Sequence, residues 1–103
     1  MSEQINILGT TYTVKYVDYI SKEELKIGEV DYINQEIRIM NNLSNDIKNV
    51  TLWHEIIHAI LNQLGFEEAE NEHLVQSLAT GIHQVTSENN SVYRKEKTWL
   101  GMN

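Results

Sequence analysis

The sequence has no cysteine among its 103 residues. This absence excludes disulfide bonds, cysteine-based zinc fingers and thiol nucleophiles. A metal site in this chain would therefore need histidine and carboxylate ligands. The chain also has no apolar run that approaches the length needed to span a bilayer, and its hydrophobic fraction of 41% is ordinary for a globular protein. We expect no membrane segment.

Basic residues are scarce as well. The chain has 8 lysines and arginines against 15 acidic residues, which gives a formal net charge of -7. This charge opposes binding to a phosphate backbone, and the basic cluster at residues 94–97 is too short to form a groove-binding patch. We therefore expect no direct nucleic-acid binding. The segment Met1–Gln4 is neither basic nor followed by a long apolar stretch, so we expect no signal peptide and a cytoplasmic location.

The most informative segment is His54–His58, which reads HEIIH. In a helix, which rises about 1.5 Å per residue, the two histidines lie one turn apart on one face. Both ring nitrogens can then bind one ion at roughly 2 Å, with Glu55 beside them as a general base. The flanking residues 50–64 are mostly apolar, which predicts a buried helix, and buried ionisable groups are costly unless they are paired or bound to metal. We predict a zinc site of the kind found in zinc peptidases.

A catalytic zinc usually has three protein ligands, so one more side chain is needed. Leu61 and Leu64 stand where metzincins have glycine and histidine, which excludes the metzincin pattern. Gly65 is predicted to end the motif helix. The third ligand must therefore lie further along the chain.

A second helix is predicted from about Glu68 or Asn71 to about Val85. Its expected apolar face consists of Leu74, Val75, Leu78, Ala79, Ile82 and Val85. Glu72 lies on the edge of that face, and we predict it as the third ligand. The alternatives for this position are Glu68, Glu70 and His73.

The residues before the motif have the pattern that is typical of β-strands. Residues 5–8 and 12–17 predict two strands around a Gly9-Thr10 turn, and residues 28–33 and 36–40 predict a hairpin. Alternation places Ile37 and Ile39 on one face of the last strand. An exposed sheet edge near the metal would offer backbone groups to an extended peptide, and the sequence leaves open whether residues 36–40 form that edge.

The segments around these strands complete the expected fold. Residues 21–25 predict one helical turn, and Ser44 or Asn45 is expected to cap the motif helix. This order predicts an α+β domain in which a short antiparallel or mixed sheet packs on the motif helix and on a second helix. We expect one domain over residues 1–86 and a polar tail over residues 87–103.

Residues Thr51–Ile60, the preceding hairpin and residues Asn71–Val75 resemble the ImmA/IrrE-type metallopeptidases of phages and mobile elements. The resemblance covers roughly residues 5–85. It implies a zincin-type core in which a glutamate of the next helix, here Glu72, completes the metal site. Some members cleave helix-turn-helix repressors, so the resemblance also implies a repressor as the protein substrate.

The main hypothesis is a zinc-dependent endopeptidase, in which His54, His58 and Glu72 bind Zn²⁺ and Glu55 transfers protons. Candidate donors for the oxyanion are Tyr32 and Tyr93. The alternative is a non-catalytic regulatory binding module that keeps the zincin core and docks to a DNA-binding protein, a partner that an acidic surface would favour. A purely structural zinc site is a third possibility, but it would have no use for a base at position 55.

Overall fold

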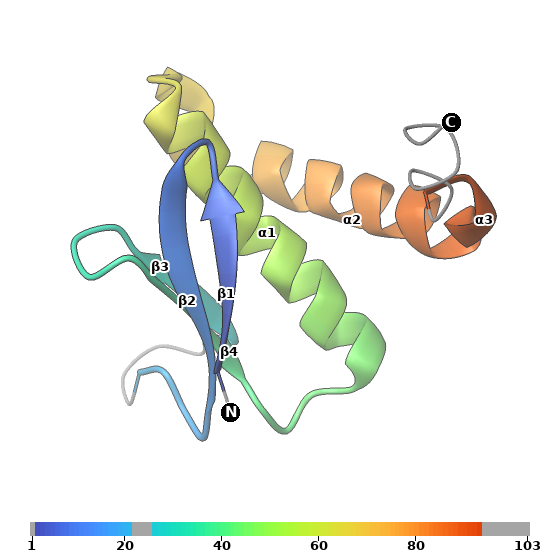
Figure 1. The fold of residues 1–103 in the computed structure, drawn as a ribbon, viewed down its shortest axis with the longest axis horizontal. Coiled ribbons are helices and arrows are strands. Elements are labelled where there is room, and N and C mark those ends of the chain that lie inside the picture. The colour runs from blue at the N-terminus through green and yellow to red at the C-terminus, as the bar shows by residue number, and fades with distance from the viewer. Residues whose placement is uncertain (1, 22–25, 94–103) are drawn as a thin grey trace.

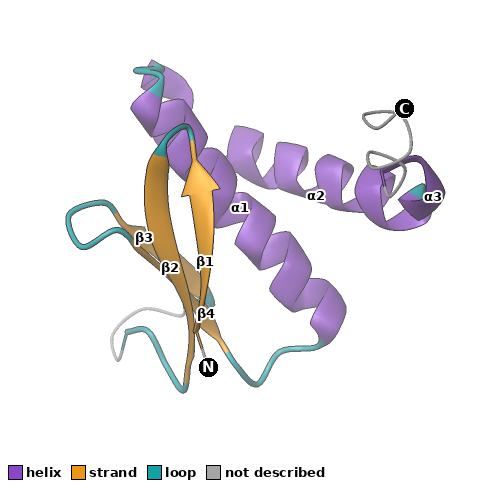
Figure 2. Ribbon diagram, in the orientation of Figure 1, coloured by secondary structure: helices purple, strands orange, loops and turns teal. Residues whose placement is uncertain are grey.

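A computed structural model of the chain describes residues 2–21 and 26–93. The elements are, in order, β1 (Ser2–Ile7), β2 (Thr10–Val17), β3 (Gly28–Asp31), β4 (Glu36–Met40), α1 (Asn45–Gln63), the 3-10 helix η1 (Glu67–Glu70), α2 (Glu72–Glu88) and α3 (Asn90–Tyr93). Figure 2 shows the strands gathered on one side and the helices on the other. The predicted α+β fold is therefore confirmed. Residues 22–25 of the predicted helical turn, and residues 94–103 of the predicted tail, lie outside the described residues.

The strands form one mixed sheet in the order β1-β2-β4-β3. β1 pairs with β2 and β3 pairs with β4 in antiparallel fashion, whereas β2 and β4 are parallel. The first turn has positive φ at both Leu8 (50°) and Gly9 (89°), as a type I′ hairpin turn requires. Because β4 lies inside the sheet, the segment 36–40 is not an edge. The edges are β1 and β3.

The inner face of the sheet carries the main core. Ile37 and Ile39 are fully buried under α1, as the alternation of β4 predicts. They pack with residues from β1, β2 and α1, namely Ile7, Tyr12, Val14, Ile56 and Ala59. Burial of this apolar surface fixes α1 across the sheet.

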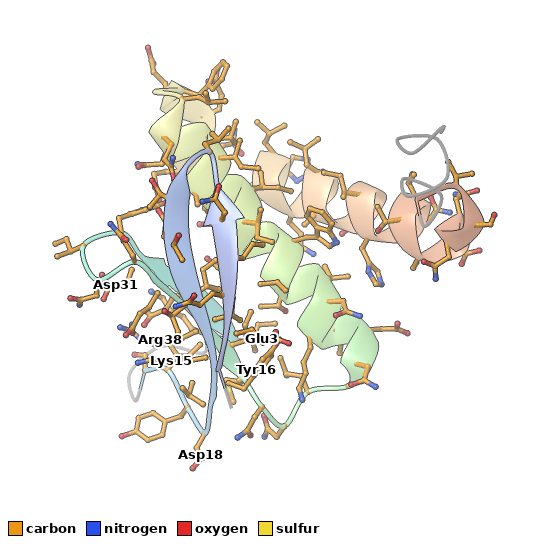
Figure 3. The ribbon with its side chains drawn as sticks, viewed as in Figure 1. Glu3, Lys15, Tyr16, Asp18, Asp31 and Arg38 are labelled. Atoms are coloured by element: carbon orange, nitrogen blue, oxygen red, sulfur yellow. The ribbon has the colours of Figure 1, made fainter. Side chains whose placement is uncertain are left out.

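The outer face of the sheet is polar and charge-paired. Lys15 contacts Glu36 at 2.8 Å, and Arg38 contacts Asp31 and Glu36 at 2.9 Å each and also pairs with Glu29. Figure 3 shows Lys15, Arg38 and Asp31 close together on the strands. The charges of this face are thus largely satisfied among themselves.

Helix α1 lies between the sheet and α2 (Figure 1). Trp53 packs against both the main core and a smaller core formed by Ile57, Val75 and Ala79. The predicted apolar face of α2 is only partly correct, because Leu78 and Val85 are each 41% exposed. Among the described elements α2 packs mainly on α1, which buries Val75 and Ala79 completely and leaves Leu78 and Val85 at the edge of the contact. In the described part of the chain, no helix combines the length and the apolar character that crossing a membrane would require.

Candidate metal centre

Helix α1 holds His54 and His58 one turn apart on the side that faces α2. The helix begins after Ser44, whose hydroxyl accepts a hydrogen bond from the Ile47 amide at 3.3 Å, so the predicted N-cap is confirmed. It ends at Gln63 with Leu64 as its C-cap, and the next residue, Gly65, has a φ of 80°. The Gly65 amide donates to the Asn62 carbonyl, and the Phe66 amide donates to the Leu61 carbonyl, as in a Schellman motif.

The turn after α1 brings Glu72 back over the two histidines. Helix α2 begins at Glu72, and its N-cap Asn71 accepts a hydrogen bond from the Leu74 amide at 3.0 Å. The Glu72 Oε1 atom lies 2.9 Å from His54 Nε2 and 3.3 Å from His58 Nε2. The two Nε2 atoms are 3.1 Å apart. The potential ligand atoms of these three residues all lie within 4.8 Å of one another.

The other ring nitrogen of each imidazole faces a carbonyl oxygen. His58 Nδ1 lies 2.6 Å from the Ala69 carbonyl oxygen, and His54 Nδ1 lies 2.7 Å from Gln76 Oε1. Because a carbonyl oxygen only accepts hydrogen bonds, each Nδ1 carries the hydrogen. In the neutral form of each imidazole, Nε2 then directs a lone pair toward the same point as the Glu72 carboxylate. Three electron-pair donors that converge in this way fit a cation.

Glu55 is 5% exposed and lies beside this group. Among the described residues, no hydrogen-bond donor is paired with its carboxylate. Burial raises the pKa of Glu55 from 4.5 to about 7, against the effect of His54, and the charges of Glu72 and Glu29 raise the pKa further. A carboxyl group with this pKa is suited to exchange protons near neutral pH.

The electrostatics of Glu72 differ from those of Glu55. Partial burial alone would raise the pKa of Glu72, but the hydrogen bonds that His54 and His58 donate through Nε2 when they are protonated, and the positive charge that they then carry, outweigh it, so the pKa lies below the ordinary value. The side chain is 68% exposed, against 17% for His54 and 7% for His58. Glu72 is therefore ionised at neutral pH and open to the pocket.

His54, His58 and Glu72 line an open pocket of about 420 Å³ between β3 and the helices α1 and α2. The start of β3 approaches α1 closely because residue 28 is glycine. A Cβ atom at Gly28 would lie 2.5 Å from Thr51 Cγ2 and 3.1 Å from Glu55 Oε2. An edge strand therefore forms one wall of the pocket, opposite Glu72 and Gln76.

The structure separates the predicted third ligand from its alternatives. Within the described residues, the ligand group consists of His54, His58 and Glu72. Glu70 lines the pocket without joining this group, and Glu68 and His73 are exposed outside it.

Tyr32, a predicted oxyanion donor, lines the same pocket. Burial, followed by the charges of Glu70 and Glu55, raises its pKa to about 12. The phenol therefore keeps its proton at neutral pH and remains a hydrogen-bond donor. The side chain of Tyr93, the other predicted donor, lies outside the described residues.

Sequence reasoning missed Gln76, the residue that contacts His54 Nδ1. Its spacing contained a signal, because Gln76 follows Glu72 by one helical turn, as His58 follows His54. Two pairs of polar side chains, one pair on each helix, thus contact each other at the pocket.

Comparisons of the chain with protein-family models, with curated proteins and with solved structures give no match.

Proposed function

We propose that this protein is a zinc-dependent endopeptidase. The observation that carries the proposal is the convergence of His54 Nε2, His58 Nε2 and the Glu72 carboxylate in an open pocket, with the buried Glu55 beside them. A ligand set of two histidines and one glutamate favours zinc over other common divalent metals, and it leaves one coordination position for a substrate or water. Four protein ligands would be expected at a structural zinc site.

Each residue of the site has a role in peptide hydrolysis. Zinc bound here supplies Lewis acidity to a peptide carbonyl and to water. Glu55 accepts a proton from the attacking water and donates it to the leaving amine, a task that its raised pKa supports. Tyr32 donates a hydrogen bond to the oxyanion that forms on the substrate.

The substrate is a protein segment that binds in extended form along β3. This strand is a sheet edge, and Gly28, Glu29 and Val30 line the pocket. An edge strand offers backbone groups to an added strand, which would place a substrate carbonyl over the ligand group.

The resemblance of Thr51–Ile60 and Asn71–Val75 to ImmA/IrrE-type metallopeptidases supports a helix-turn-helix repressor as the substrate. A repressor carries basic surface for DNA, and a net charge of -7 on this chain would favour the encounter. The corresponding location is the cytoplasm.

Metal content per chain tests the site directly. The protein is purified without chelators or nickel resin, and the wild type is compared with His54→Ala, Glu72→Ala and the control His73→Ala. We expect one zinc per chain in the wild type and in His73→Ala, and a loss of zinc in the other two variants. A wild type that stays free of metal after zinc is supplied would overturn the proposal.

Turnover separates an enzyme from a binding module. Candidate repressors are incubated with the zinc-loaded wild type and with Glu55→Gln, and the products are identified by mass spectrometry. Cleavage by the wild type alone supports the endopeptidase. Equal displacement of the repressor from DNA by both proteins, without cleavage, would favour a non-catalytic module.

A further inference from the structure

Gln76 is the side chain that accepts a hydrogen bond from His54 Nδ1, the ring nitrogen that faces away from Glu72. Its Oε1 atom lies 2.7 Å from His54 Nδ1, and its Nε2 atom donates to Thr80 Oγ1 at 3.3 Å. Thr80 lies one turn further along α2, so the helix itself supplies the partner of the amide nitrogen. In this arrangement the amide nitrogen faces Thr80 and the amide oxygen faces the imidazole.

The two histidines depend on different kinds of acceptor. His58 donates to the main-chain carbonyl of Ala69, and that acceptor remains whatever side chain occupies position 69. His54 donates to the side chain of Gln76, and that acceptor is lost when the residue changes. His54 is also the more exposed imidazole, at 17% against 7% for His58. The orientation of His54 is therefore the weaker part of the site.

We infer that Gln76 is a positioning residue, which holds His54 with its hydrogen on Nδ1 and its Nε2 lone pair directed at the metal. This inference rests on the proposed metal site and extends it by assigning a residue that does not contact the ion. Groups that hydrogen-bond to metal-binding histidines fix the tautomer and the ring orientation, and their loss lowers metal affinity about 10- to 100-fold. Because Gln76 is exposed and water can partly replace it, we expect a loss of about tenfold.

The test compares Gln76→Leu, which removes the acceptor, with Gln76→Glu, which keeps an acceptor oxygen. The matched control is Gln84→Leu, the same change at an exposed position of α2 away from the pocket. Zinc affinity is measured by competition with a chromophoric chelator. We expect about tenfold weaker binding in Gln76→Leu, and wild-type or tighter binding in Gln76→Glu and Gln84→Leu.

Nitrogen-15 spectra of the imidazole rings give a second readout, recorded with and without zinc. The His54 Nδ1–H signal should be protected from exchange with water in the wild type and lose that protection in Gln76→Leu. The His58 Nδ1–H signal is the internal control and should not change, because its acceptor is the backbone of Ala69.

Three outcomes would overturn this inference. They are equal zinc affinity in Gln76→Leu and Gln84→Leu, equal loss in Gln76→Leu and Gln76→Glu, and a His54 signal that Gln76→Leu leaves unchanged. A wild type that binds no zinc would overturn the proposed function instead. The metal-free spectra would then still decide whether Gln76 orients His54.

Discussion

Replacement of Glu55 by glutamine is expected to stabilise the metal-free protein at neutral and alkaline pH and to abolish hydrolysis by the zinc-loaded protein. Glu55 is 5% exposed, and none of the described residues donates a hydrogen bond to it. An ionised carboxylate in this position is poorly solvated, whereas an amide of the same shape carries no charge. The substitution therefore removes an unfavourable charge from the folded state.

The size of the effect follows from the pKa. The pKa of Glu55 rises from 4.5 to about 7 on folding. Each pKa unit corresponds to about 1.4 kcal/mol, so the shift is worth about 3 kcal/mol. Because the folded-state pKa is raised, the protonated carboxyl stabilises the fold fully below pH 4.5, and this contribution is lost as the pH rises through about 7.

The assay is urea denaturation of the metal-free wild type and Glu55→Gln between about pH 4.5 and pH 8, in the presence of a chelator. Other groups titrate in both proteins, so the informative quantity is the difference between their free energies of unfolding. We expect this difference to change in favour of Glu55→Gln by about 3 kcal/mol across the range. Glu68→Gln, which changes an exposed glutamate of η1, is the control and should show no such change.

A difference between wild type and Glu55→Gln that does not vary with pH would refute the reasoning. It would mean that the Glu55 carboxylate is solvated or paired in the folded protein, and the case for a general base would weaken with it. Gain of stability together with loss of hydrolysis would instead identify Glu55 as a residue kept for its chemistry.

Three further predictions concern the fold around the site. Gly28→Ala should destabilise the protein by about 1 to 3 kcal/mol, because its Cβ would lie 2.5 Å from Thr51 Cγ2. Thr51→Ser removes that methyl carbon, so the double variant should recover part of the lost stability. If thermal denaturation shows that the free-energy effects of the two substitutions simply add, the contact is contradicted. Ile37→Ala, at a fully buried position, should lower the free energy of unfolding in urea by about 2 to 5 kcal/mol. The control Ile33→Ala, at a position that is 92% exposed, should lower it by less than about 0.5 kcal/mol. Equal losses of stability would argue against the packing of β4 under α1. Removal of zinc should speed amide hydrogen exchange in α2 but not in β4, because α2 begins with the candidate ligand Glu72 and β4 contributes none of the candidate ligands. Unchanged exchange in α2 would show that metal does not hold the helix.

Features that depend on neighbouring residues could be predicted from the sequence. The N-cap at Ser44, a positive-φ glycine at position 65 just after the C-cap of α1 and the burial of Ile37 and Ile39 all follow from short-range rules, and the structure has them. The four-residue spacing of His54 and His58 also predicts that both side chains lie on the same face of α1. Glu72 could be preferred over its rivals because helical geometry limits which side of α2 can face α1.

Features that depend on long-range arrangement could not be predicted. The parallel pairing of β2 with β4 makes β3 an edge, and no local pattern encodes which strands become neighbours. The exposure of Leu78 and Val85 depends on how many elements cover α2. Gln76 was overlooked because a glutamine on a helix surface is common, and only the position of His54 gives it a partner.

The candidate ligands and the acceptors of both imidazoles all lie between His54 and Gln76, in α1, η1 and α2. The sheet contributes a wall and a core to the site but none of these groups. In the proposed endopeptidase, choice of metal and choice of substrate would therefore be encoded in separate stretches of the chain. Substitutions or insertions along β3 could change which peptide is bound and leave the ion in place.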